Sequence, residues 1–137
     1  MKHLSESQKT MIIHVLTERF QAFSIVLFGT AAKETLRPDS DVDIAFIADV
    51  SPPPYDIFMT AQELADHLKR EVDLVDFRQA STVFQTQIIT NGVILIDYNR
   101  TERQYAFMRS LKEYAMLNEE RSAILQKKGF IERGITH

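Results

Sequence analysis

The apolar positions of this chain recur first with helical and then with strand-like spacing. Ser5, with Gln8 three residues later, resembles a capping box, and apolar residues follow at helical spacing up to Phe20. The segment 23–28 is short, apolar and rich in β-branched and aromatic residues, and Gly29 follows it. This pattern predicts a helix and then a buried strand that ends at a turn.

The rest of the chain repeats the same two patterns. The spacing predicts a short helix over 30–36, a turn over 37–40, a strand over 41–47, a stiff proline connector over 52–54, a helix over 56–70, a strand over 72–77, a helix over 82–91, a strand over 93–96 and a helix from about 101 to 128. The expected core-facing residues of two helices are Phe58, Ala61, Leu64, Ala65 and Leu68, and then Met108, Leu111, Tyr114 and Ala115.

Alternating helices and strands in one short chain indicate an α/β or α+β fold, with about four strands in a small sheet and helices packed on it. We expect a single domain over residues 1–137, with a tail after the last helix that can be flexible. The composition, 45% hydrophobic and 26% charged, is typical of one soluble globular domain.

Charge and cysteine content narrow the function classes. The net charge of −3, without a long basic run, argues against direct binding to DNA. The absence of cysteine excludes disulfides, thiolate zinc sites and cysteine nucleophiles, so a cytoplasmic location is the default. The longest apolar runs fall far short of the ~20 residues that span a bilayer, so no membrane association is expected.

Candidate chemistry is concentrated in Gly29-Thr30 and in the pair Asp41 and Asp43. Side chains at i and i+2 of a strand share a face, and paired carboxylates there can bind hard cations such as Mg²⁺. A glycine at a strand end lets backbone approach a phosphate, and the neighbouring hydroxyl adds a donor. For the aspartate pair alone, solvated carboxylates at a strand start are the better explanation. The combination of the pair with the preceding strand, Gly29-Thr30 and Ser40 is much rarer, and it favours a phosphate site beside a cation site.

These residues resemble the minimal nucleotidyltransferases (MNT) of the DNA polymerase β superfamily. Their signature is Gly-Ser, ten residues, then Asp-any-Asp, and here it reads Gly29-Thr30 followed by Asp41-Val42-Asp43. Asp73 matches the third aspartate of the family, and the match spans residues 23–77. The resemblance implies a polymerase-β-like fold with a small mixed four-stranded sheet.

The resemblance also implies the roles of the site residues. Asp41 and Asp43 would bridge two Mg²⁺ ions, and Asp73 would complete the site of the catalytic one. Gly29, Thr30 and Ser40 would hold the phosphates of ATP, the nucleotide donor. Asp76 is the rival for the third aspartate, but it would face the other side of a regular strand.

Many proteins that resemble this chain are antitoxins encoded beside a HEPN-domain ribonuclease toxin, and they transfer AMP to a tyrosine of that toxin. The first hypothesis is therefore a protein adenylyltransferase acting on a HEPN partner. One alternative is a binding module that masks its partner sterically, with vestigial aspartates. Another is a small-molecule nucleotidyltransferase of aminoglycoside type, disfavoured because members this small lack an acceptor-binding domain.

The remaining notable side chains favour structural roles. His14 and His67 lie within helical patterns without a partner at metal-ligand spacing, which indicates structural or surface histidines. Tyr105, Phe107 and Tyr114 are expected to pack a helix rather than to stack on a base.

Overall fold

The computed structural model describes residues 4–32 and 40–133. The turn expected over 37–40 and most of the helix expected over 30–36 lie outside the described residues, as does the end of the tail. The elements follow the predicted order: α1 (Glu6–Phe20), β1 (Ser24–Phe28), η1 (Gly29–Ala32), β2 (Val42–Ile47), α2 (Pro54–Leu68), β3 (Val72–Asp76), η2 (Phe77–Gln79), α3 (Thr82–Asn91), β4 (Val93–Asp97) and α4 (Arg100–Arg133).

Local chemistry sets two of the helix starts. The expected capping box begins α1, where the Ser5 hydroxyl accepts from the Gln8 amide at 3.2 Å and the Gln8 side chain accepts from the Ser5 amide at 2.8 Å. The proline connector was expected to stay outside the next helix, but Pro54 is the first residue of α2. A first-turn amide has no partner within its helix, so proline loses nothing there.

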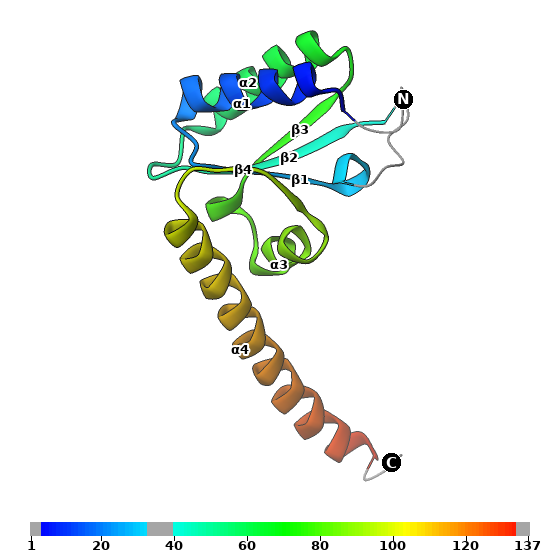
Figure 1. Cartoon of the computed structure of the whole chain (residues 1–137). Helices are drawn as coiled ribbons and strands as arrows, with labels where there is room; N and C mark the ends of the chain where they lie inside the picture. The colour runs from blue at the N-terminus through cyan, green and yellow to red at the C-terminus, as the bar shows by residue number, and fades with distance from the viewer. Residues whose placement is uncertain (1–3, 33–39, 134–137) are drawn as a thin grey trace.

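The strands form one mixed sheet in the order β3-β2-β1-β4. Strands β2 and β3 run parallel, whereas β1 is antiparallel to both β2 and β4. Helices α1 and α2 cover one face of the sheet, and α3 and the beginning of α4 cover the other (Figure 1). None of the helices within the described ranges is long and apolar enough to cross a membrane.

The central strand β2 divides its side chains between two apolar clusters. Alternate residues from Val42 to Phe46 join the cluster under α1 and α2. Ala45 and Ile47 join the cluster under α3 and α4. Because strand side chains alternate between faces, Asp43 shares the face of Ala45 and therefore lies on the α3 side of the sheet.

The expected core face of α2 is wrong at one position. Ala61, Leu64 and Leu68 are buried as predicted, but Phe58 is 58% exposed. The apolar stripe that packs on the sheet continues through Ile57, one residue earlier. Phe58 is about 100° further round the helix and points away from the core.

The expected core face of α4 is also wrong. Met108 and Leu111 are exposed, whereas Ala106 and Ser110 are buried. The Ser110 hydroxyl donates to the Gln85 side chain at 2.9 Å, so a polar contact forms part of the packed face. Small residues let α4 approach α3 closely, and the helix is turned so that the longer apolar side chains face outward.

Of the three aromatic residues expected to pack, one does not. Phe107 packs on Phe77 with the two rings tilted and their centroids 5.4 Å apart, and Tyr114 is half-buried, but Tyr105 is exposed.

Candidate active site

Two of the predicted carboxylates lie side by side near the start of parallel strands. Asp43 of β2 is the register partner of Asp73 of β3. Adjacent strands are about 4.8 Å apart and register partners point the same way, so both side chains share the α3 face of the sheet. Asp41 is exposed and lies immediately before β2. The three carboxylates are therefore gathered at one end of the sheet.

Gly29 lies against the Asp43 carboxylate. Phe28, the last residue of β1, is the register partner of Asp43, and Gly29 follows it with a left-handed φ of +61°. A Cβ built on Gly29 would overlap the Oδ2 atom of Asp43. The glycine thus satisfies both a backbone conformation that L side chains disfavour and a close approach between the turn and the carboxylate.

We expect Gly29→Ala to lower the free energy of unfolding by about 1 kcal/mol because of the positive φ. The same change should weaken the rise in melting temperature that we expect from Mg²⁺ and ATP, since the new methyl group displaces the Asp43 carboxylate. Denaturant unfolding and thermal shift measure the two effects. Gly29→Asn separates them, because asparagine tolerates the left-handed conformation but still carries a Cβ. A normal ligand-induced shift in both variants would contradict this assignment.

The electrostatics of the site centre on Asp43. The pKa of Asp43 is raised from 3.8 to about 6, chiefly by partial burial and then by the negative charges of Asp73 and Asp41, in that order of importance. The three carboxylates are therefore close enough to repel one another. A bound cation would relieve that repulsion.

The donor atoms suit a hard cation that is shared with a substrate. Across the described part of the chain, no three acidic or histidine side chains form a ready-made metal cluster. Magnesium is usually bound by one or two carboxylates together with substrate phosphates rather than by a cage of protein ligands. The paired carboxylates of Asp43 and Asp73, beside a turn without a side chain, fit that mode of binding.

The remaining predicted residues divide into two groups. Thr30 lies in η1, the single turn that follows β1, and Ser40 is half-buried at the entrance to β2. Asp76 lies at the far end of β3 and is buried, and its carboxylate accepts a hydrogen bond from the Arg78 amide at 3.1 Å. Asp76 therefore caps η2 and does not join the carboxylate group, as its position three residues beyond Asp73 predicted.

Helix α3 supplies contacts that the sequence did not reveal. Phe84 packs edge-on against Phe28, with ring centroids 5.6 Å apart, directly behind the turn at Gly29. Gly92 ends α3 with an ordinary φ of −82°, but a Cβ there would overlap the Ile88 carbonyl and the Val26 side chain. No sequence pattern marks these contacts, because they join segments far apart along the chain.

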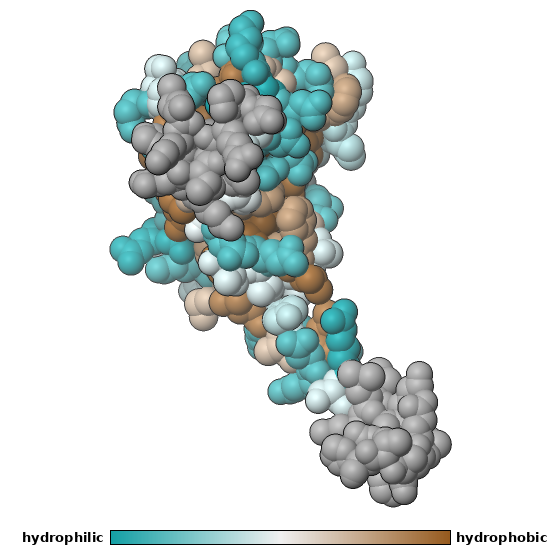
Figure 2. All heavy atoms as spheres, turned by 90° about the vertical axis from the view of Figure 1, so that its right-hand side faces the viewer, coloured by the Kyte–Doolittle hydropathy of each residue, from teal (hydrophilic) through white to brown (hydrophobic). Residues whose placement is uncertain are grey.

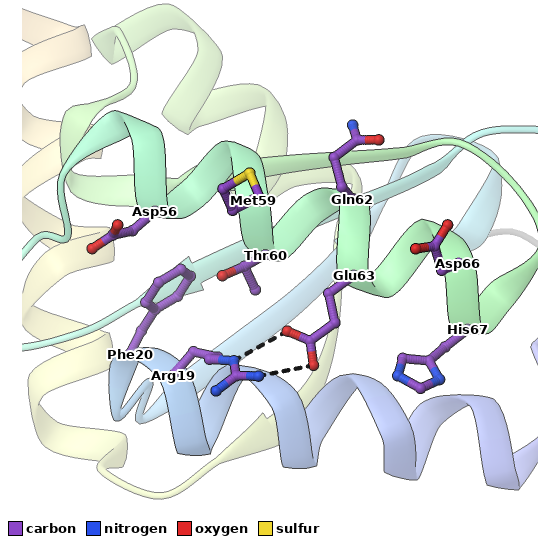
Figure 3. A pocket seen from close by; sticks show the side chains of 9 residues that line it. All are labelled: Arg19, Phe20, Asp56, Met59, Thr60, Gln62, Glu63, Asp66 and His67. Carbon is purple, nitrogen blue, oxygen red and sulfur yellow. Dashed lines mark hydrogen bonds and ion pairs between the residues drawn. The ribbon is translucent and has the colours of Figure 1, made fainter.

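A separate cavity lies away from these residues. It has a volume of about 690 Å³ and opens between α1 and α2, on the opposite face of the sheet from Asp43 (Figure 3). Within this cavity, the Arg19 guanidinium donates two hydrogen bonds to the Glu63 carboxylate, from Nε to Oε1 at 3.1 Å and from Nη2 to Oε2 at 3.2 Å (Figure 3). His67 lines this cavity and is exposed, and His14 is exposed on α1. The cavity contains none of the predicted site residues.

Comparison with known proteins agrees with this arrangement. Residues 10–101 match the family described as polymerase beta, nucleotidyltransferase. The chain belongs to this family. Membership of this family confirms two predictions, namely the polymerase-β-like fold and nucleotidyltransferase activity.

Individual relatives of this nucleotidyltransferase are known in more detail. It is 33% identical over 126 residues to the protein adenylyltransferase MntA of Shewanella oneidensis, covering 91% of this chain and 88% of the relative. A chain in a crystal structure of a toxin–antitoxin complex with AMP-PNP superposes with a TM-score of 0.79 and is 32% identical, over 87% of this chain and 96% of that one.

A chain in a structure of tri-AMPylated Shewanella oneidensis HEPN toxin with its MNT antitoxin superposes with a TM-score of 0.76. It is 30% identical, over 90% of this chain and 98% of that one. The predicted resemblance to minimal nucleotidyltransferases is thus confirmed.

Proposed function

We propose that this nucleotidyltransferase is an antitoxin that transfers AMP from ATP to a tyrosine of a HEPN toxin and so neutralises it. The observation that carries the proposal is the pairing of Asp43 with Asp73, together with the close approach of the Gly29 turn to Asp43. The similarity to a protein adenylyltransferase, and to chains solved with a HEPN toxin and with an ATP analogue, supports this choice of donor and acceptor. ATP as donor makes the cytoplasm the site of action.

In this proposal, Asp41, Asp43 and Asp73 bind two Mg²⁺ ions, and the turn carrying Gly29 and Thr30 binds the triphosphate together with Ser40. Ions held by these residues would supply Lewis-acid activation of the attacking hydroxyl and charge neutralisation of the leaving pyrophosphate. The tyrosine oxygen bonds to the α-phosphorus, the bond from that phosphorus to the β-bridging oxygen breaks, and the phenolic proton passes to solvent. The exposed side chains of Asp41 and Asp73 leave room for a macromolecular acceptor.

Mass spectrometry tests the proposal directly. The protein is mixed with ATP, Mg²⁺ and the product of the adjacent open reading frame, where a HEPN toxin is expected. We expect the toxin to gain the mass of one or more AMP groups on tyrosine with the natural chain. The double variant Asp41→Asn and Asp43→Asn should leave the toxin unmodified. An unmodified toxin in both reactions would refute the proposal.

The exposed apolar residues of α4 favour a second candidate function, in which this protein neutralises the toxin by binding and covering it without catalysis. A masking module should protect cells from the toxin even when both aspartates are replaced. The catalytic proposal expects that protection to be lost. Growth of cells that co-express the toxin and the double variant therefore distinguishes the two functions.

A further inference from the structure

Helix α4 extends well beyond the domain that it packs against. It has 34 residues, which correspond to a length of about 51 Å at 1.5 Å per residue. Its first turns pack on α3 through Ala106, Phe107 and Ser110, and the rest projects away from the sheet (Figure 1). A lone helix is only marginally stable in water, so a projecting helix gains from a partner.

The outer side of α4 carries apolar residues that the domain leaves uncovered. We call the surface of Tyr105, Met108, Leu111 and Met116 the α4 apolar face, and each of these side chains is between 44% and 63% exposed. Their helical spacing places Met108 opposite Ala106 and Ser110, with Tyr105, Leu111 and Met116 on either side of it. Apolar side chains are visible among polar ones along the projecting helix in Figure 2. Contiguous exposed apolar residues mark interaction surfaces.

The α4 apolar face lies on the same side of the sheet as the carboxylates. Both α3 and α4 cover the face toward which Asp43 and Asp73 point. The end of α3 reaches the carboxylate end of the sheet, because Gly92 packs on β1 and Val93 pairs with Leu27.

A small cavity of about 160 Å³ lies between α3 and α4 and is bordered by Thr86, Thr90 and Tyr114. Leu111 lies three residues before Tyr114 and is its neighbour on the surface of α4, so the α4 apolar face adjoins the wall of the cavity that Tyr114 forms. A surface on which a protein partner could lie therefore runs from the α4 apolar face along α3 toward the carboxylates.

We propose that the α4 apolar face is the surface on which the acceptor protein docks. This inference rests on the proposed function, because that reaction needs a protein whose tyrosine reaches the carboxylates from the α3 side. A partner lying along α4 and the groove would approach from that side. A second copy of this chain is the competing occupant of this face. If a second copy bound there, it would cover the surface that leads to the carboxylates, and the acceptor would have no continuous surface on which to bind.

The test is a charge substitution on this face with a matched control on the other side of the sheet. Met108→Glu combined with Leu111→Glu keeps good helix formers in α4. The control combines Phe58→Glu and Met59→Glu on α2, where the side chains are 58% and 47% exposed. We expect the α4 variant to weaken binding to the HEPN protein, and to raise its KM in AMP transfer, by about tenfold or more. Its kcat and the thermal shift with Mg²⁺ and ATP should match those of the control.

Each outcome is decisive. Normal binding and KM in the α4 variant, or an equal loss in the α2 control, would overturn the inference. Loss only of self-association, measured by light scattering on the chain alone, would assign the face to a second copy and overturn it as well. If the natural chain binds the HEPN protein without modifying it, the proposed function fails, and loss of binding in the α4 variant still supports the docking surface. If the natural chain does not bind it at all, both are rejected.

Discussion

Asp43→Asn is expected to lower the rate of AMP transfer by about 10³-fold or more while the chain stays folded. Asp43 has the carboxylate that lies beside Asp73, acts electrostatically on Asp41 and touches the Gly29 turn, so its loss affects cation and phosphate binding together. Metal-assisted charge stabilisation contributes several kcal/mol to such reactions, and each ~1.4 kcal/mol corresponds to a factor of ten in rate. Single-turnover transfer to the HEPN protein at saturating ATP measures the effect.

Asp76→Asn is the matched control for this prediction. Asp76 lies on the same strand as Asp73 but caps η2, so its replacement should cost about 1 kcal/mol of stability. Its transfer rate should stay within a few-fold of the natural chain. A comparable rate loss in both variants would show that the carboxylate group has been misidentified, and near-normal transfer by Asp43→Asn would remove Asp43 from the catalytic site.

The elements of this fold could be predicted from the sequence because their signals are local. The capping box at Ser5, the apolar strand before Gly29 and the alternation after Asp41 each lie within a few residues of the structure that they specify. The pairing of Asp43 with Asp73 is different, because it joins strands separated by a whole helix. Spacing placed both residues near strand starts, but only the family resemblance suggested that the two strands are neighbours.

The orientation of α4 could not be predicted because polar contacts help to set it. The Arg103 guanidinium bonds the Asp97 carboxylate at 3.0 Å, and the Ser110 hydroxyl bonds Gln85 inside the interface. A method that assigns the core face by apolar periodicity selects Met108 and Leu111 instead. The error is informative, since apolar residues that the fold leaves outside are those that a partner can use.

The last prediction concerns stability in the absence of metal and nucleotide. The pKa of Asp43 in the folded chain is about 6, against 3.8 ordinarily, so the folded state holds the proton more tightly than the unfolded state. The stabilisation from this proton is complete below about pH 4 and is lost as the pH rises through 6. A shift of this size corresponds to at most ~3 kcal/mol, and solvent screening of a partly exposed group reduces it to about 2 kcal/mol.

The measurement is denaturant unfolding with EDTA at several pH values between 4 and 7, for the natural chain and for Asp43→Asn. Ionisable groups far from the site are common to both proteins and cancel in the comparison, so the difference between the two reports on Asp43 and its immediate carboxylate neighbours. We expect the free energy of unfolding of the asparagine variant to rise with pH relative to that of the natural chain, so that the variant is the more stable protein at pH 7. Saturating Mg²⁺ with ATP should reverse that order, because ligand bound only by the folded natural chain stabilises it by mass action. A difference in stability that does not change with pH would mean that neither burial nor the neighbouring charges raise the pKa of Asp43, and the electrostatic reason for a cation at this end of the sheet would be lost.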